Sequence, residues 1–193
     1  MTLRVKADYA EYAVEIATQQ KQPDAQLQEL SDARKRLAEA LAGNAKLQLG
    51  TGTTDIVALP QSAGGGVVSF LAGYSATARV SVLYPLAEND DLITVTREVT
   101  KIIREIPIPA GASYKYTVGG ATPRVESPGQ HRVQLLKLIL DDVSRVKSVF
   151  STATSISVSG LSEPIRQVRV DDTHVDLYID YKLTVQVGES SHP

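Results

Sequence analysis

Alternating apolar and polar residues predict three long strands in this chain. A period of two, which places successive side chains on opposite faces of a strand, runs through Tyr9–Thr18, Phe70–Leu86 and Val175–Val187. In the last of these segments every odd position is apolar or aromatic, and the even positions are polar except Tyr178. At about 3.3 Å per residue, this segment predicts one antiparallel strand of roughly 40 Å that can set the register of a whole sheet.

Apolar residues at helical spacing predict three helices. The first follows Pro23, with Asp24 as its N-cap and Gly43 just beyond its last residue. Its buried stripe consists of four leucines: Leu27, Leu30, Leu37 and Leu41. The second helix lies between the capping segment Asn89–Asp91 and a pair of prolines, and the third is Gln130–Phe150.

Shorter segments complete the pattern of an α+β fold. Weaker strand signals occur at Lys46–Leu59, Ser113–Val118, Thr154–Ser159 and Ile165–Val170. One long loop is predicted at Gly119–Gly129. The order of elements predicts a mixed, largely antiparallel sheet with about three helices packed on it and a long C-terminal strand. We expect a single domain over residues 1–193, with a flexible hairpin arm at residues 60–70. The glycines at its tip, Gly64–Gly66, indicate either a simple loop or a contact with a neighbouring chain.

Composition excludes several classes of function. The chain has 193 residues, 42% of them hydrophobic, which is enough to form a core. Its net charge is -2 and its 20 basic residues are scattered, so no nucleic-acid partner is expected. The absence of cysteine excludes disulfides, thiolate nucleophiles and the usual zinc clusters. No apolar run is long enough for a transmembrane segment, and the first residues lack the apolar region of a signal peptide.

One segment and the three histidines are candidates for binding or catalytic sites. The segment Gly50–Thr54 offers glycines and hydroxyl groups to a phosphate but lacks the lysine of a P-loop, so a turn is favoured. The histidines His131, His174 and His192 have neither a metal-ligand spacing nor the arrangement of a Ser-His-Asp triad. We therefore expect no catalytic, cofactor-binding or metal-binding residues.

Four aspartates form an acidic stripe near the C-terminal hairpin: Asp171, Asp172, Asp176 and Asp180. A calcium site would need oxygen ligands that converge from a loop, and the EF-hand spacing is missing. The favoured interpretation is a solvated sheet face whose charge discourages pairing with another strand.

The third predicted helix has more apolar surface than one sheet contact can cover. Leu136, Ile139 and Leu140 belong to its main stripe, whereas Leu135 and Leu138 lie beside that stripe. We therefore expect a homo-oligomer with Leu135 and Leu138 at the subunit contact. The alternative is that the hairpin over residues 56–86 covers this helix within one chain.

Three segments resemble the SIMPL-domain family of bacterial envelope proteins. The strand-to-helix transition Asp8–Leu41, the run Leu71–Val82 before a capped helix, and the strand leading into Gln130–Phe150 are similar to that family. The Gly73-Tyr74 pair followed by Val80 and Val82 matches its "GY.A....V.V" strand. The chain departs from the family in its first residues, which lack an exported leader and a "VTGEG" turn, and in its leucine-rich third helix.

The resemblance implies a non-enzymatic protein of the periplasm or cell envelope, a family in which some members assemble into ring-like oligomers. It transfers no catalytic residues, cofactor or small-molecule ligand to this chain. We expect a structural protein that acts through protein–protein interaction, by self-assembly or binding. The alternative is a structural subunit of a larger ring, shell or phage particle, which would place it in the cytoplasm or a virion. An enzyme is the third hypothesis.

Overall fold

The computed structural model describes residues 1–58, 74–88, 90–150 and 153–187. Their contacts divide the chain into two compact units. Unit 1 contains Met1–Asp8 and Pro123–Pro193, and unit 2 contains Tyr9–Thr122. The sequence predicts one domain over residues 1–193, whereas the contacts group the chain into these two units, and each is described here by itself. The predicted arm at residues 60–70 lies outside the described residues.

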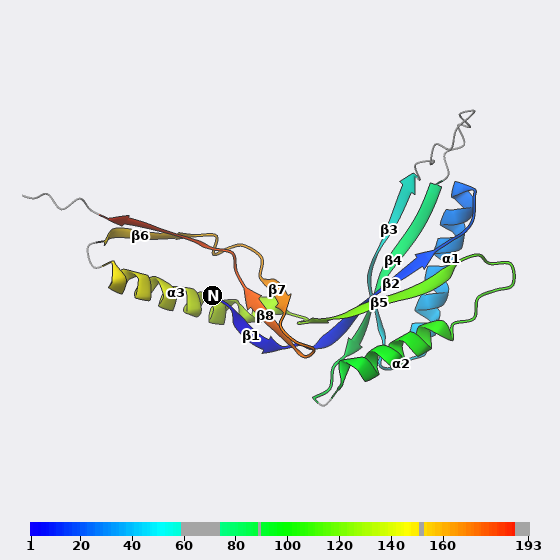
Figure 1. Cartoon of the computed structure of the whole chain (residues 1–193), viewed down its shortest axis with the longest axis horizontal. Helices are drawn as coiled ribbons and strands as arrows, with labels where there is room; N and C mark the ends of the chain where they lie inside the picture. Colours follow the sequence, from blue (N-terminus) through cyan, green and yellow to red (C-terminus); the bar gives the residue numbers. More distant parts are fainter. Residues whose placement is uncertain (59–73, 89, 151–152, 188–193) are drawn as a thin grey trace, which may run out of the picture. The chain divides into compact units, whose positions relative to one another are not determined.

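In the described residues, unit 2 is a four-stranded sheet with two helices (Figure 1). Along the chain its elements are β2 (Tyr9–Ala17), α1 (Pro23–Ala42), β3 (Gln48–Ala58), β4 (Tyr74–Pro85), α2 (Leu92–Arg104) and β5 (Lys115–Arg124). The strands lie in the order β3-β4-β2-β5, and β4 pairs antiparallel with both β2 and β3. This βαββαβ order is that of the ferredoxin-like folds, and the predicted α+β class is confirmed.

Both helices of unit 2 cover the same face of its sheet. The even positions of β2 and β4 are buried, as their period of two predicts, and they share one core with residues of α1 and α2. The largest fully buried side chains of this core include Tyr12, Val14, Ile16, Leu37, Leu41, Val80, Val82, Val99 and Ile103. Because alternate side chains of a strand lie on one face, a single shared core places both helices on that face.

α1 begins two residues earlier than predicted, and its cap differs. The N-cap residue is Gln22, which makes no side-chain capping bond, and Pro23 occupies the first turn. Asp24 is therefore not the N-cap, although its charge still suits the positive end of the helix. The buried stripe of α1 also differs from the predicted one. Gln26 occupies the buried position one turn before Leu30, whereas Leu27, which the sequence assigns to the stripe, is 41% exposed. Gly43 follows the helix as predicted but has an ordinary right-handed conformation with φ of -78°.

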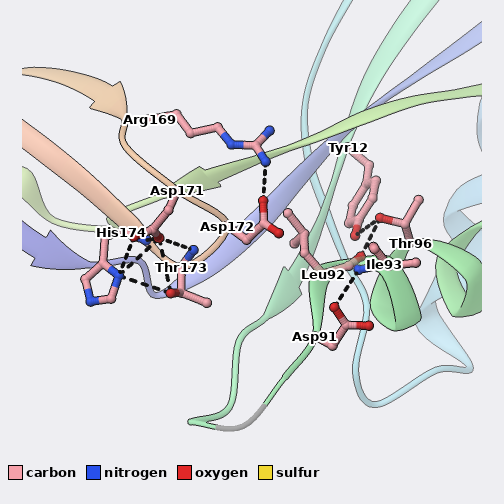
Figure 2. A network of polar contacts seen from close by, with 10 residues as sticks. All are labelled: Tyr12, Asp91, Leu92, Ile93, Thr96, Arg169, Asp171, Asp172, Thr173 and His174. Atoms are coloured by element: carbon pink, nitrogen blue, oxygen red, sulfur yellow. Dashed lines mark hydrogen bonds and ion pairs between the residues drawn. The ribbon is translucent and has the colours of Figure 1, made fainter.

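α2 has the predicted N-cap. The carboxylate of Asp91 accepts hydrogen bonds from the backbone N–H groups of Ile93 at 3.4 Å and Thr94 at 3.0 Å, as Figure 2 shows in part. The hydroxyls of Tyr12 and Thr96 lie 3.1 Å apart and join β2 to the first turns of this helix. The cap and the buried face together explain why a helix rich in β-branched residues forms here.

β5 extends further than the sequence predicts. A loop is predicted over Gly119–Gly129, whereas the strand continues to Arg124. A methyl group at Gly119 would lie 3.0 Å from the carbonyl oxygen of Ala13, so the glycine allows the two backbones to approach. Pro123 is tolerated because β5 is an edge strand of its sheet, where a residue without a backbone N–H need not break the ladder. The loop prediction is therefore wrong for the residues that belong to β5.

In the described residues, unit 1 contains a three-stranded sheet, a two-stranded ribbon and one long helix (Figure 1). The sheet has the order β1-β8-β7, with bounds Leu3–Lys6, His174–Tyr178 and Arg166–Arg169. The ribbon pairs β6 (Ala153–Ser159) with β9 (Lys182–Val187), and the helix is α3 (Arg132–Val149), preceded by a 3₁₀ helix, η1 (Pro128–His131). The sequence predicts α3, β6 and β7 but not β1, which is too short to show a pattern.

The predicted strand Val175–Val187 is interrupted in the structure. It forms β8 and β9, which belong to different sheets, and residues 179–181 lie between them. The nearest paired positions on the two sides are Ser159 with Lys182 and Arg166 with Tyr178. Residues 160–165 therefore lie opposite residues 179–181, and these unequal segments act like a large bulge in one long hairpin.

The core of unit 1 lies where α3 meets the sheet. Its buried apolar residues are Val125, Leu135, Ile139, Val175, Leu177 and Ile179. Further along the helix and the ribbon, the described apolar residues that pack against this core are half-buried, among them Val143, Val158 and Tyr181. The end of unit 1 formed by the ribbon and the second half of α3 therefore has an incompletely covered interior.

Candidate functional site

α3 carries apolar residues on its surface as well as in the core. Leu135 is 1% exposed, whereas Leu140 is 61% and Val133 is 63% exposed. The sequence predicts the reverse, with Leu140 buried and Leu135 at a subunit contact, and this prediction is wrong. Leu138, the other predicted contact residue, is half-buried. A helix turns by about 100° per residue, so the inward direction of Ile139 leaves Leu140 on a flank.

Two contacts identify the flanks of α3. The hydroxyl of Tyr181 donates a hydrogen bond of 2.5 Å to the carboxylate of Asp142, which ties one flank to the segment between β8 and β9. Arg132 donates to the carbonyl oxygen of Leu161 at 2.6 Å, on the segment between β6 and β7. Leu140 precedes Asp142 by two residues, so it lies about 160° around the helix from Asp142. Leu140 is therefore on the flank nearer β6.

The contact with Asp142 also changes the chemistry of Tyr181. The hydrogen bond to this carboxylate, together with partial burial and the charge of Asp142, raises the pKa of Tyr181 to about 12. The phenol therefore stays protonated and acts as a donor that holds α3 on the segment between β8 and β9.

Among the helices in the described part of the chain, none is both long enough and apolar enough to cross a bilayer.

Each carboxylate of the predicted acidic stripe has a partner within the protein. Three ion pairs join Arg4 to Asp176 at 3.1 Å, Arg166 to Asp180 at 2.8 Å, and Arg169 to Asp172, and the ring of His174 lies 3.1 Å from the carboxylate of Asp171. In the part of the chain that the structure describes, no group of three or more His, Asp or Glu side chains could hold a metal ion. The stripe is thus dispersed into separate surface pairs, which contribute little stability each.

Asp171 organises the turn between β7 and β8 (Figure 2). Its carboxylate accepts hydrogen bonds from the backbone N–H groups of Thr173 at 2.8 Å and His174 at 2.7 Å. The hydrogen bond from the Thr173 N–H, helped by those of His174 and opposed by slight desolvation, lowers the pKa of Asp171 to about 2. The sequence predicts a turn here, and the structure shows that the first aspartate closes it.

We expect the Asp171 turn to open only in strong acid. Its folded pKa of about 2 lies below the ordinary value of 3.8, so its contribution to stability is complete above pH 3.8 and is lost as the pH falls towards 2. An NMR titration of the Asp171 carboxyl carbon should have its midpoint near pH 2, and the Thr173 amide should shift with it. In Asp171→Asn the amide shift should disappear. A carboxyl midpoint near 3.8 would contradict this geometry.

The histidines remain apart. His131 ends η1, where its ring lies 3.2 Å from the side-chain oxygen of Gln134. His174 faces Asp171 in the turn just described. His192 lies outside the described residues.

The segment Gly50–Thr54 is part of β3, and the predicted turn is wrong. A register shift in the pairing with β4 falls between Leu49 and Gly52. A methyl group at Gly50 would lie 3.0 Å from the side chain of Ser81, so this glycine permits close approach at the bulge. A hollow of about 240 Å³ is lined by Gly52 and Arg79, among other residues. The guanidinium of Arg79 is paired with the carboxylate of Glu15 at 3.2 Å.

A second hollow, of about 370 Å³, follows the last turns of α2. It is lined by Thr96, Arg97, Thr100, Lys101, Arg104 and Glu105. Lys101 is 3.9 Å from Glu105, and both side chains are mostly exposed. This arrangement is a solvated basic helix end, which suits the negative end of the helix dipole.

Comparisons with known proteins assign no family to this chain. No model of a protein family matches it, and no curated protein matches it. The exposed apolar flank of α3 is therefore the feature from which a function can be argued.

Proposed function

We propose that this chain is a non-enzymatic structural protein that acts through self-assembly into a homo-oligomer. The observation that carries this proposal is the exposed apolar flank of α3. Val133 and Leu140 are more than 60% exposed, seven residues apart and therefore on one side of the helix. Val149, which is about 180° around the helix from Leu140, and Phe150, just beyond the helix, are also exposed, at 75% and 44%. Apolar side chains gathered on one element, beside a half-covered core, are typical of a protein interface.

A partner on this flank would also complete the interior of unit 1. Val143, Val158 and Tyr181 face the core yet keep part of their surface exposed. Removing apolar surface from water stabilises by roughly 25 cal/mol per Å². A neighbouring chain against α3 would supply that burial without any new chemistry in the protein.

A non-enzymatic role is supported by the way the structure uses its candidate polar residues. Three aspartates of the stripe form separate ion pairs with arginines, and the fourth, Asp171, closes a turn. The arginine beside the Gly50–Thr54 segment is paired with Glu15. The resemblance to the SIMPL-domain family favours a place in the periplasm or cell envelope over the alternative of a shell or phage particle.

The mass of the chain in solution tests this proposal. Sedimentation velocity at micromolar concentration should give an oligomer for the wild type and a smaller species for the double variant Val133→Glu, Leu140→Glu. The double variant Gln134→Glu, Ser148→Glu adds the same charge at exposed polar positions of the same helix and should assemble like the wild type. The predicted contact residue Leu135 is unsuitable for this test, because it lies in the core. A wild type that is monomeric would overturn self-assembly.

A further inference from the structure

β6 is a sheet edge without the usual protection against pairing with another chain. In the described residues it pairs with β9 alone, so one row of its backbone N–H and C=O groups has no partner strand. Its sequence, ATSISVS over Ala153–Ser159, contains neither a charged residue nor a proline. The other edges among the described strands all carry charge: Arg4 and Lys6 in β1, Asp55 in β3, Lys115 and Arg124 in β5, Arg166 and Arg169 in β7, and Lys182 in β9.

The side chains of β6 suit a sheet that continues beyond it. Ile156 and Val158 are half-buried on the face towards α3, whereas Ser155, Ser157 and Ser159 are exposed on the other face. A two-stranded ribbon is marginally stable by itself, and more strands under a helix stabilise it. An added strand must therefore bring apolar residues to one face and small polar residues to the other.

We propose that the partner strand is β6 of a second copy of this chain, antiparallel and related by a two-fold axis at Ser157. This inference rests on the proposed self-assembly and names its interface. The pairing of β6 with β9 is regular from Ser155 to Ser159, and Ser157 is the centre of that segment. The axis sets Ile156 opposite Val158 of the partner subunit, and serine opposite serine. A sheet of four strands, β9-β6-β6-β9, would result.

The spacing of helices and strands agrees with this arrangement. Each α3 covers a ribbon of two strands, and strands lie about 4.8 Å apart, so the two α3 helices would be separated by roughly 10 Å. Packed helices have interaxial distances of about 8–10 Å. The two helices would therefore lie in contact on the same face of the shared sheet.

The exposed leucine of α3 lies close to the proposed axis. Ser157 is four residues from the start of β6, or about 13 Å along the strand. At about 1.5 Å per residue, the same distance back along α3 from Val149 reaches the level of Leu140. Leu140 is also on the flank nearer β6, so Leu140 would face Leu140 of the partner subunit. The strand edge and the exposed apolar flank are thus two parts of one surface.

A matched pair of lysine variants tests the interface. Ser157 and Thr184 are opposite each other in the ladder between β6 and β9, and both are exposed. Ser157→Lys places two lysines against each other at the proposed axis, where like charges oppose pairing. Sedimentation velocity should show at least a tenfold weaker association for Ser157→Lys and an unchanged one for Thr184→Lys. Mixing Ser157→Lys with Ser157→Glu should restore the association.

Cysteine cross-linking is an independent test of the interface, because it detects the proximity of two chains and does not require a substitution that weakens their association. The chain has no cysteine, so Ser157→Cys introduces a single thiol per chain. Under mild oxidation, Ser157→Cys should form a covalent dimer in high yield, because directly opposed residues of antiparallel strands lie within reach of a disulfide. Thr184→Cys should remain a monomer on a non-reducing gel.

The outcomes separate this inference from the broader proposal. A wild type that assembles while Ser157→Lys associates normally and Ser157→Cys fails to cross-link overturns the β6 interface and leaves self-assembly standing. Cross-linking by Thr184→Cys in place of Ser157→Cys moves the contact to β9 and also overturns the inference. A monomeric wild type overturns both. Circular dichroism of each variant confirms that a loss of association is not a loss of fold.

Discussion

Replacing Leu177 with alanine is expected to lower the free energy of unfolding of unit 1 by about 2–5 kcal/mol. Leu177 is 0% exposed and lies in β8, the central strand of its sheet. It is paired with Leu3 on one side and with Gln167 on the other, and it packs in the core with Ile139. The cavity left by the alanine would therefore be enclosed by strands on both sides and could not collapse easily. A denaturant titration followed by circular dichroism measures the loss.

Leu183 provides the comparison, since it lies on the same predicted strand and has the same side chain. The sequence predicts that Leu183 is as deeply buried as Leu177, because both occupy odd positions of one alternating segment. In the structure Leu183 belongs to the ribbon and is half-buried, so Leu183→Ala should cost clearly less. Lys182→Ala, on the exposed face, should leave the midpoint unchanged. Equal losses for Leu177→Ala and Leu183→Ala would mean that the core of unit 1 extends along the whole hairpin.

Local patterns were sufficient to predict the elements that bury one complete face. The alternation in β2 and β4 and the capping signal at Asp91 depend on neighbouring residues alone, and both are confirmed. The interruption of the C-terminal strand depends instead on residues 160–165, which are distant in sequence from residues 179–181. No periodicity within either segment contains that information.

The surface of α3 could be predicted only in part, for a similar reason. The excess of apolar residues is visible in the sequence, but the side that faces the core depends on where the sheet touches the helix. The contacts of Arg132 and Asp142 set that orientation, and they leave Leu140 exposed where the sequence favours Leu135. A difference of about 100° in helical phase is enough to exchange a core residue for a surface one.

Gly160 lies where the hairpin is interrupted, and Gly160→Ala is expected to be strongly destabilising. Gly160 has a φ of +87°, a left-handed conformation that costs a residue with a side chain about 1–2 kcal/mol. A methyl group there would also lie 2.6 Å from the carbonyl oxygen of Asp180 and 3.2 Å from the Cα atom of Tyr181. Both are backbone atoms, so neither can rotate away, and overpacking adds about 1–3 kcal/mol. We expect a total loss of about 2–5 kcal/mol in a denaturant titration.

Gly111 separates the two causes of this loss. Its φ is +86°, almost the same as that of Gly160, but a methyl group at Gly111 would meet no atom within 4 Å. Gly111→Ala should therefore show the conformational cost alone, about 1–2 kcal/mol, and the difference between the two variants measures the contact with Asp180. Equal losses for the two variants would mean that the backbone atoms of Asp180 and Tyr181 do not contact the methyl group at residue 160, which would contradict the close approach described here. If Gly160→Ala costs more, the additional loss measures the close approach of residues 160 and 180, at the point where one long hairpin is divided into the sheet and the ribbon.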